Sequence, residues 1–249
     1  MPIIDAHTHL AGTTFDEEVL RDGARLGVQA FLCSAIAHYR HYPSFAEVAE
    51  SNAALAQVMA KHPGVVRGYC YVNPRHGAEA MSEFTRCVEE YGMIGLKLWV
   101  ATTCDDPLVY PFIERAIHYR MPILAHCWEK TVGQLPYETR PVNIARLAAR
   151  YPEAHIIMAH LGGRVESAVN TVRECPNVLT DTSGTPIGGA EVAIAVQRLG
   201  ADRVVFGSDL HGACLAANIG KILGANLSIV DQDRVLGGNI ARLLEGVRR

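Results

Sequence analysis

The sequence predicts an α/β protein with one domain over residues 1–249, a closed (β/α)8 barrel. Short apolar runs rich in β-branched residues alternate with longer amphipathic stretches, the alternation occurs eight times, and no linker or low-complexity segment interrupts it. Strands that are each followed by a helix pair in parallel through right-handed crossovers. Their nearly continuous apolar character indicates burial on both faces. Eight such units in about 250 residues match a barrel of eight parallel strands.

Each predicted strand is a short apolar run, and each predicted helix is a longer stretch with helical periodicity. The strands are Ile3–His7, Val28–Ser34, Val65–Val72, Ile94–Trp99, Pro122–His126, His155–His160, Asn177–Thr182 and Arg203–Asp209. The helices between them are Asp16–Leu26, Ser44–Lys61, Ala78–Tyr91, Leu108–Tyr119, Arg140–Arg150, Arg164–Glu174 and Ala190–Leu199, and Ala213–Leu223 and Asp231–Glu245 follow the eighth strand. A doubly wound open sheet is the alternative, but it usually has fewer strands at this length, and no GxGxxG motif follows the first strand.

The composition excludes several classes of function. The chain is 49% hydrophobic and 20% charged, with a formal net charge of -3, so nothing indicates the basic patch that a nucleic-acid partner needs. Its apolar runs are far shorter than the roughly 20 residues of a membrane span. Residues 1–10 carry acid and histidine, so we expect no signal peptide. The 7 scattered cysteines without a CxxC motif suit reduced thiols. We therefore expect a cytoplasmic protein whose partner is a small-molecule substrate.

Side chains that carry chemistry stand at the C-terminal ends of five predicted strands. The first strand leads into two histidines in His-x-His spacing, which an extended chain projects to the same face. In a barrel the C-terminal ends of all strands meet on one face, where active sites are built. The residues that this arrangement would bring together are His7, His9, Lys97, His126, His160 and Asp209.

This set of side chains predicts a metal site. Neutral imidazoles and a carboxylate bind divalent ions, and a catalytic site keeps one position open for water. We expect a divalent metal, Zn²⁺ first among them, with one or two ions per chain. Such an ion lowers the pKa of bound water toward about 7. Asp209 is then placed to take the proton of that water and pass it to a leaving group.

Seven stretches, in this order, resemble the amidohydrolase superfamily, in particular the amidohydrolase-related branch that includes aminocarboxymuconate-semialdehyde decarboxylase. They are DAHTHL, GLKLW, PILAH, RPVNIARLAARYPEAHIIMAHLGG, LTDTSG, RVVFGSD and VLGGNIARLL, and together they cover essentially the whole chain. The resemblance implies a TIM barrel with a metal at its mouth. It also implies that the metal ligands are His7, His9, His126 and Asp209, while His160 either completes a second metal site or acts as an acid/base.

Two departures from this branch bear on the substrate rather than on the metal. His211 stands two residues after Asp209, where the branch often has proline. The chain is also short for the branch, so its loops are trimmed. A partner subunit could close the open mouth, and a homodimer is therefore one candidate assembly.

Lys97 has three interpretations, because a lysine on a buried strand is costly unless it is paired. In the first, Lys97 is carboxylated and bridges two metals, as in some members of the superfamily. In the second it is an ammonium that binds an anionic substrate, and in the third it forms a structural ion pair inside the barrel. The sequence does not separate these three.

The main functional hypothesis is a metal-dependent hydrolase, in which a metal-activated water attacks a small amide, ester or lactone. Asp209 serves as ligand and proton shuttle, and His160 or Lys97 polarises the substrate oxygen. The alternative is a metal-dependent, non-oxidative decarboxylase of a small unsaturated or aromatic acid. It predicts proton delivery by His160 and Asp209, and recognition of the anion by Arg164, Lys97 or His211.

Two other hypotheses come from different classes of function. One is a barrel that binds a metal or ligand without turnover. The other is phosphate binding at GTPIGG, residues 184–189. Among the weaker site candidates, Trp128 and Glu129 would line the pocket and Arg164 would meet a carboxylate. Asp181 and Ser183 would orient a ligating histidine.

Overall fold

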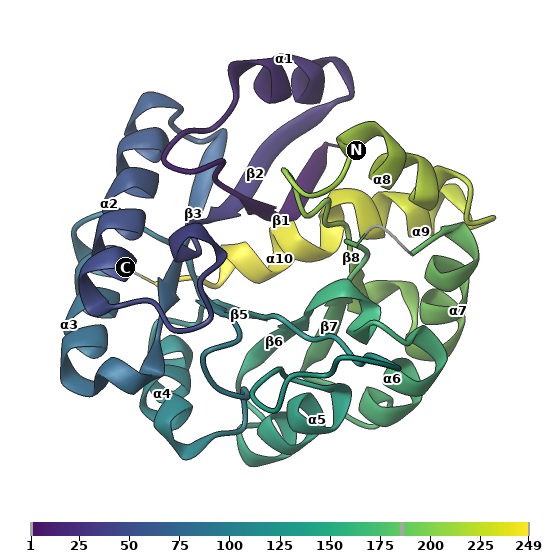
Figure 1. The fold of residues 1–249 in the computed structure, drawn as a ribbon. Helices are drawn as coiled ribbons and strands as arrows, with labels where there is room; N and C mark the ends of the chain where they lie inside the picture. Colours follow the sequence, from purple (N-terminus) through teal and green to yellow (C-terminus); the bar gives the residue numbers. More distant parts are fainter. Residues whose placement is uncertain (1, 185–186, 249) are drawn as a thin grey trace.

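The computed structural model describes residues 2–184 and 187–248. Eight strands pair in parallel in the order of the chain, from β1 to β8. Backbone hydrogen bonds across the remaining gap join the first strand to the last segment: Ala6 N–H donates to the Phe206 carbonyl at 2.9 Å, and Asp209 N–H donates to the His7 carbonyl at 2.8 Å. Viewed along its axis, the barrel is surrounded by helices (Figure 1). The predicted (β/α)8 TIM barrel is therefore confirmed.

The strands agree with the predicted ones except at their ends. They are β1 (Ile3–His9), β2 (Val28–Ser34), β3 (Val66–Val72), β4 (Gly95–Leu98), β5 (Pro122–Ala125), β6 (His155–Met158), β7 (Val178–Asp181) and β8 (Val204–Val205). The first strand continues through His9. The eighth strand is much shorter than the predicted Arg203–Asp209, because Phe206 N–H donates to the Val235 carbonyl and Asp209 takes a left-handed φ of 60°.

The helices follow the strands as expected, and short 3-10 turns join several of them. They are α1 (Glu17–Arg25), α2 (Phe45–Lys61), α3 (Gly77–Glu89), α4 (Tyr110–His118), α5 (Pro141–Arg150), α6 (Val165–Val172), α7 (Gly189–Leu199), α8 (Leu215–Leu223), α9 (Ile229–Asp233) and α10 (Asn239–Glu245). Side chains cap several N-termini; Ser44, for example, forms a capping box with Glu47 at the start of α2.

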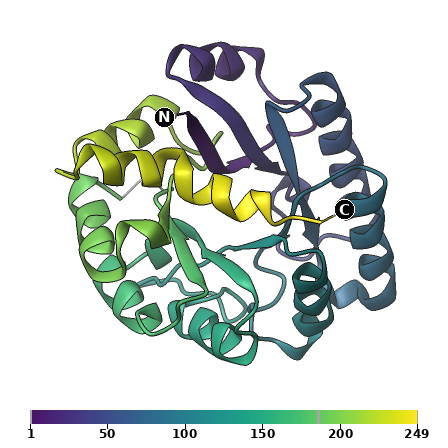
Figure 2. The same cartoon turned by 180° about the vertical axis from the view of Figure 1, so that it is seen from behind.

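The predicted helix near Asp231–Glu245 is helical throughout, but a π-helical turn divides it. The structure has α9, a π-helical turn over Arg234–Gly238, and α10. A Cβ at Gly237 would collide with the carbonyl of Pro2, so this turn lies directly against the start of β1. Seen from behind, α10 crosses the N-terminal end of the barrel (Figure 2). Its side chains Ile240 and Leu244 belong to the apolar cluster inside the barrel near this N-terminal end.

The apolar core has two layers. One lies between the strands and the surrounding helices, and the other lies inside the barrel, where Leu32, Tyr69, Ile94 and Leu124 are buried. Full burial of each such side chain stabilises the fold by roughly 1.5–3 kcal/mol. These apolar residues fill the part of the barrel interior near the N-terminal ends of the strands. The polar side chains at the C-terminal ends of the strands gather at the other end of the barrel. Among the described residues, no helix is long and apolar enough to cross a membrane.

Candidate metal centre

Two histidines and an aspartate meet where β1 ends and the segment after β8 bends. The Nε2 atoms of His7 and His9 are 3.1 Å apart. Asp209 Oδ1 lies 3.3 Å from His9 Nε2 and 3.7 Å from His7 Nε2. The backbone explains the approach, since Asp209 N–H donates to the His7 carbonyl and the left-handed turn aims its carboxylate back at the strand. The structure therefore brings together three residues that are up to 202 positions apart in the chain.

His160 belongs to the same cluster. Possible ligand atoms of His7, His160 and Asp209 all lie within 4.8 Å of one another. The chain turns at His160 with a φ of 60°, and its backbone N–H donates to Asp181 Oδ1 at 3.0 Å. Its ring is held in turn by Ser183, whose Oγ lies 2.8 Å from Nδ1.

Asp181 and Ser183 at the end of β7 orient the histidines, as the sequence suggests. His7 Nδ1 donates to Asp181 Oδ2 at 2.8 Å, because an ionised carboxylate only accepts. Burial alone would favour the neutral acid, but the neighbouring His7 and His160 and the hydrogen bond from Ser183 outweigh it and hold the pKa of Asp181 well below its usual value. With the proton on Nδ1, the Nε2 atom of a neutral His7 presents an electron pair to the cluster.

Ser34 likewise fixes which ring nitrogen of His9 carries the proton. His9 Nδ1 lies 2.8 Å from Ser34 Oγ and 3.4 Å from the Ser34 carbonyl, which can only accept. Burial lowers the pKa of His9 to about 4, so its contact with Asp209 is not a pair of opposite charges. The two Nε2 electron pairs and the Asp209 carboxylate thus converge without enough protons to satisfy them. This donor set suits a divalent metal ion.

Lys97 reaches into this cluster from β4. Its side chain is fully buried, and its Nζ lies 2.9 Å from His7 Nε2. Burial lowers the pKa of Lys97 to about 8, although the carboxylates of Asp181 and Asp209 oppose that shift. The amine therefore contacts the same electron pair of His7 that a metal ion would use.

His126 lies beside the cluster but is held differently. Its ring centre is 5.2 Å from that of His160, and its Nε2 lies 3.1 Å from Glu138 Oε1. Its Nδ1 is buried and has no hydrogen-bond partner among the described residues. Burial also lowers the pKa of His126, which keeps the ring neutral. Sequence reasoning did not single out Glu138, since no motif marks this loop residue.

A cavity of about 330 Å³ adjoins His126. Its walls include Trp99, Trp128 and Leu135, and Lys130 and Glu138 supply its charges. The ring of Trp128 also packs 5.0 Å from that of His160. The predicted pocket residue Trp128 therefore lies between the cavity and the histidine cluster.

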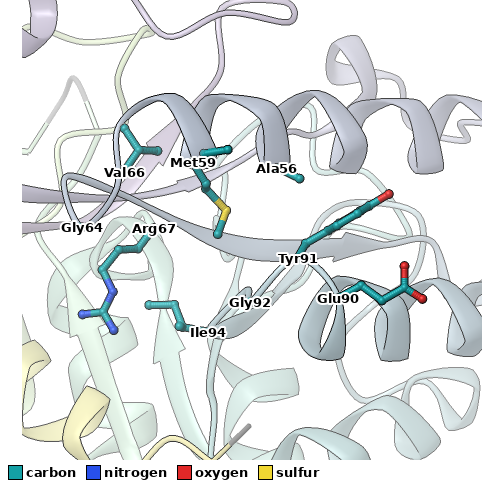
Figure 3. A pocket seen from close by; sticks show the side chains of 10 residues that line it. Ala56, Met59, Gly64, Val66, Arg67, Glu90, Tyr91, Gly92 and Ile94 are labelled. Atoms are coloured by element: carbon teal, nitrogen blue, oxygen red, sulfur yellow. The ribbon is translucent and has the colours of Figure 1, made fainter.

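A larger cavity of about 400 Å³ lies at the other end of the strands (Figure 3). It opens between α2 and the end of α3, with Met59, Tyr91 and Ile94 in its lining. It contains no histidine, and the N-terminal face of such barrels serves stability rather than catalysis. We therefore place the candidate site at the histidine cluster despite the larger volume of this cavity.

The weaker sequence candidates are scattered. Arg164 is exposed and lines a separate cavity with Glu166 and Glu191, between α6 and α7. His211 is half-buried, and its ring packs 5.7 Å from that of Phe15. Glu129 is tied through its backbone N–H to the Gly162 carbonyl at 2.9 Å. The GTPIGG hypothesis falls on residues 185–186, which lie outside the described residues.

Comparison with protein families matches the amidohydrolase family over residues 4–246. The chain belongs to the amidohydrolase family. The search of curated proteins found no match. Among solved structures, the chain resembles 2,6-dihydroxybenzoate decarboxylase from Rhizobium, with a TM-score of 0.79, 16% identity and 98% of each chain covered.

Two further structures are similar to this chain at comparable levels. The 5-carboxyvanillate decarboxylase from Sphingomonas paucimobilis has a TM-score of 0.75 and 20% identity, covering 93% of this chain and 83% of that one. The dihydroxybenzoic acid decarboxylase from Polaromonas sp. JS666 was solved with manganese and 2-nitroresorcinol. It has a TM-score of 0.76 and 19% identity, covering 98% of this chain and 97% of that one. At these identities the likeness shows a shared fold.

Proposed function

We propose that this member of the amidohydrolase family is a metal-dependent decarboxylase of a small unsaturated or aromatic acid. The observation that carries the proposal is the cavity beside His126, which is walled by Trp99 and Trp128 and suits a flat ring. The three similar structures named above support it, since all are decarboxylases of substituted benzoates by name.

The proposed metal ligands are His7, His9, His126 and Asp209. Zn²⁺ fits a set rich in imidazole, and the manganese in one similar structure makes Mn²⁺ the second choice. When bound, such an ion supplies Lewis-acid chemistry by polarising substrate oxygen atoms.

Decarboxylation breaks a carbon–carbon bond, releases CO₂ and requires one proton at the carbon that is left. We assign this proton to His160. Ser183 fixes its Nδ1, so Nε2 is the atom that carries and releases the proton. Burial holds the pKa of His160 well below its usual value, so the ring is neutral at rest and must take up a proton from solvent or substrate before it delivers that proton to the carbon. Asp209 is the second group close enough to take part.

Hydrolysis of a small amide, ester or lactone is the second candidate. It is the first hypothesis from the sequence, and it uses the same ligands, with Asp209 as the proton shuttle. The three similar structures named above favour the first candidate, because they are decarboxylases by name.

A substrate panel tests the proposal. Protein reconstituted with Zn²⁺ or Mn²⁺ should release CO₂ from at least one hydroxybenzoate or related unsaturated acid, and a chelator should abolish the release. The same preparations should leave a matched panel of amides, esters and lactones intact. Cleavage of any of these without CO₂ release would instead support the hydrolase.

Lys97→Ala tests whether the site holds one metal or two. We propose that Lys97 keeps a free amine beside His7 Nε2 and provides no bridge, so we expect one metal ion per chain by elemental analysis in both wild type and variant. Lys61→Ala is the control, since Lys61 is an exposed lysine paired with Glu17. Two ions per chain, falling on loss of Lys97 alone, would mean a carboxylated bridging lysine and would favour hydrolysis.

A further inference from the structure

The loop between β5 and α5, residues 126–140, holds a buried carboxylate that the proposed reaction does not use. Glu138 is only 3% exposed, although it lies in a loop, twelve residues after His126. A buried carboxylate is costly unless hydrogen bonds and a cation compensate it. The partners of this group therefore show what it does.

Both oxygens of Glu138 are engaged by its own loop. Oε1 faces His126 Nε2 at 3.1 Å. Oε2 lies 2.8 Å from Lys130 Nζ and accepts from Gln134 Nε2 at 3.1 Å. Gln134 in turn closes the loop, because it donates to the Trp128 carbonyl and accepts from Lys130 N–H. The Thr139 side chain also anchors the loop to its surroundings, because its Oγ1 accepts from Cys104 N–H at 2.9 Å.

This arrangement decides which nitrogen of His126 carries the proton. Glu138 is paired with an ammonium and accepts at both oxygens, so the hydrogen in the contact comes from His126 Nε2. A neutral ring then has a bare electron pair on Nδ1. That atom is buried without a hydrogen-bond partner among the described residues, which is unfavourable unless a ligand takes the electron pair.

We propose that Glu138 is a positioning residue that holds His126 with Nε2 protonated and so presents Nδ1 to the metal ion. This inference rests on the metal site of the proposed function, with His126 as a ligand. The carboxylate acts through the histidine and does not touch the substrate. Lys130 and Gln134 keep the carboxylate in place.

The test uses Zn²⁺ as the probe and needs no turnover. Zn²⁺ affinity is measured by chelator competition for wild type, Glu138→Ala, Glu138→Gln and the control Glu83→Gln. Glu83 is an equally buried carboxylate on α3 that pairs with Arg86 instead. We expect Glu138→Ala to weaken Zn²⁺ binding about 10- to 100-fold. Glu138→Gln keeps an acceptor and should lose less, and Glu83→Gln should bind like wild type even if its Tm falls.

Nitrogen-15 NMR of labelled histidine gives a readout that mere loss of stability would not move. In wild type, His126 Nε2 should be protonated with and without Zn²⁺, and the Nδ1 signal should shift when Zn²⁺ binds. In Glu138→Ala both tautomers of the metal-free ring should be populated. Coordination through Nε2 in wild type, or wild-type affinity in Glu138→Ala, would overturn the proposal.

Two further results separate this inference from the proposed function. If Glu138→Ala does not fold, the wild-type spectrum and Glu138→Gln still decide the matter. Zn²⁺ binding through His126 Nδ1 without CO₂ release from any acid would leave the inference standing and remove the decarboxylase. CO₂ release with no Zn²⁺ contact at His126 would do the reverse.

Discussion

Replacing His9 with alanine should weaken Zn²⁺ binding by at least about 100-fold, more than the loss of a residue that only supports a ligand. The reason is geometric. His9 Nε2 lies within 3.3 Å of both His7 Nε2 and Asp209 Oδ1, so its removal takes one of three converging ligand atoms. Elemental analysis after dialysis and chelator competition would both measure the loss, and CO₂ release should fall with it.

The matched control for this prediction is His118→Ala. His118 is an exposed histidine at the end of α4, before the start of β5 and so at the barrel end opposite the cluster, and its loss should leave metal content unchanged. Full metal content in His9→Ala would mean that the two converging imidazoles hold something other than a metal ion. The assignment of this mouth as a metal centre would then be wrong.

The second large effect is expected for His160→Gln, which should lower kcat by about 10²- to 10⁴-fold while the metal content stays at the wild-type value. Glutamine keeps a polar side chain at this buried position but cannot carry the proton. The measurement pairs CO₂ release under saturating substrate with elemental analysis of the same preparation.

His160→Gln also separates two roles that the sequence leaves open. The geometry places His160 as close to His7 and Asp209 as a ligand would be, so the distances alone do not choose. Metal loss in His160→Gln would show that His160 is a ligand, and Asp209 would then be assigned as the proton donor. Ser183→Ala is the graded comparison, because it removes the hydroxyl that contacts His160 Nδ1, Asp181 Oδ1 and His7 Nδ1 but leaves the His160 ring, and it should cost less than His160→Gln.

The sequence predicts the barrel and most of this cluster because the C-terminal ends of all strands in a parallel barrel lie on one face. Any histidine or aspartate at the C-terminal end of a barrel strand must point to the same mouth. This is why His7, His9, His160 and Asp209 were predictable despite their distances along the chain. Asp181 and Ser183 follow from the same rule, applied to β7.

Residues on loops escape that rule. Glu138 reaches His126 only because the β5–α5 loop folds back on itself through Lys130 and Gln134, and no strand pattern encodes this path. For Arg164 the pattern predicted a site residue that the structure does not place there. Its position after LGG suggests a role in the site, but the chain turns it outward to another cavity. The π-helical turn before α10 also has no sequence signal apart from paired glycines.

The β5–α5 loop has a consequence for anyone who wishes to redesign this enzyme. Barrels of this kind acquire new specificities by exchanging the loops above the strands. Here a transplanted loop would replace the wall residue Trp128 and the carboxylate Glu138 in one step, and its anchor to Cys104 as well. A loop exchange would therefore change both the substrate specificity and the hydrogen bond that supports His126. Laboratory evolution should therefore begin at Trp99, which shapes the same cavity from the end of β4 and leaves this loop intact.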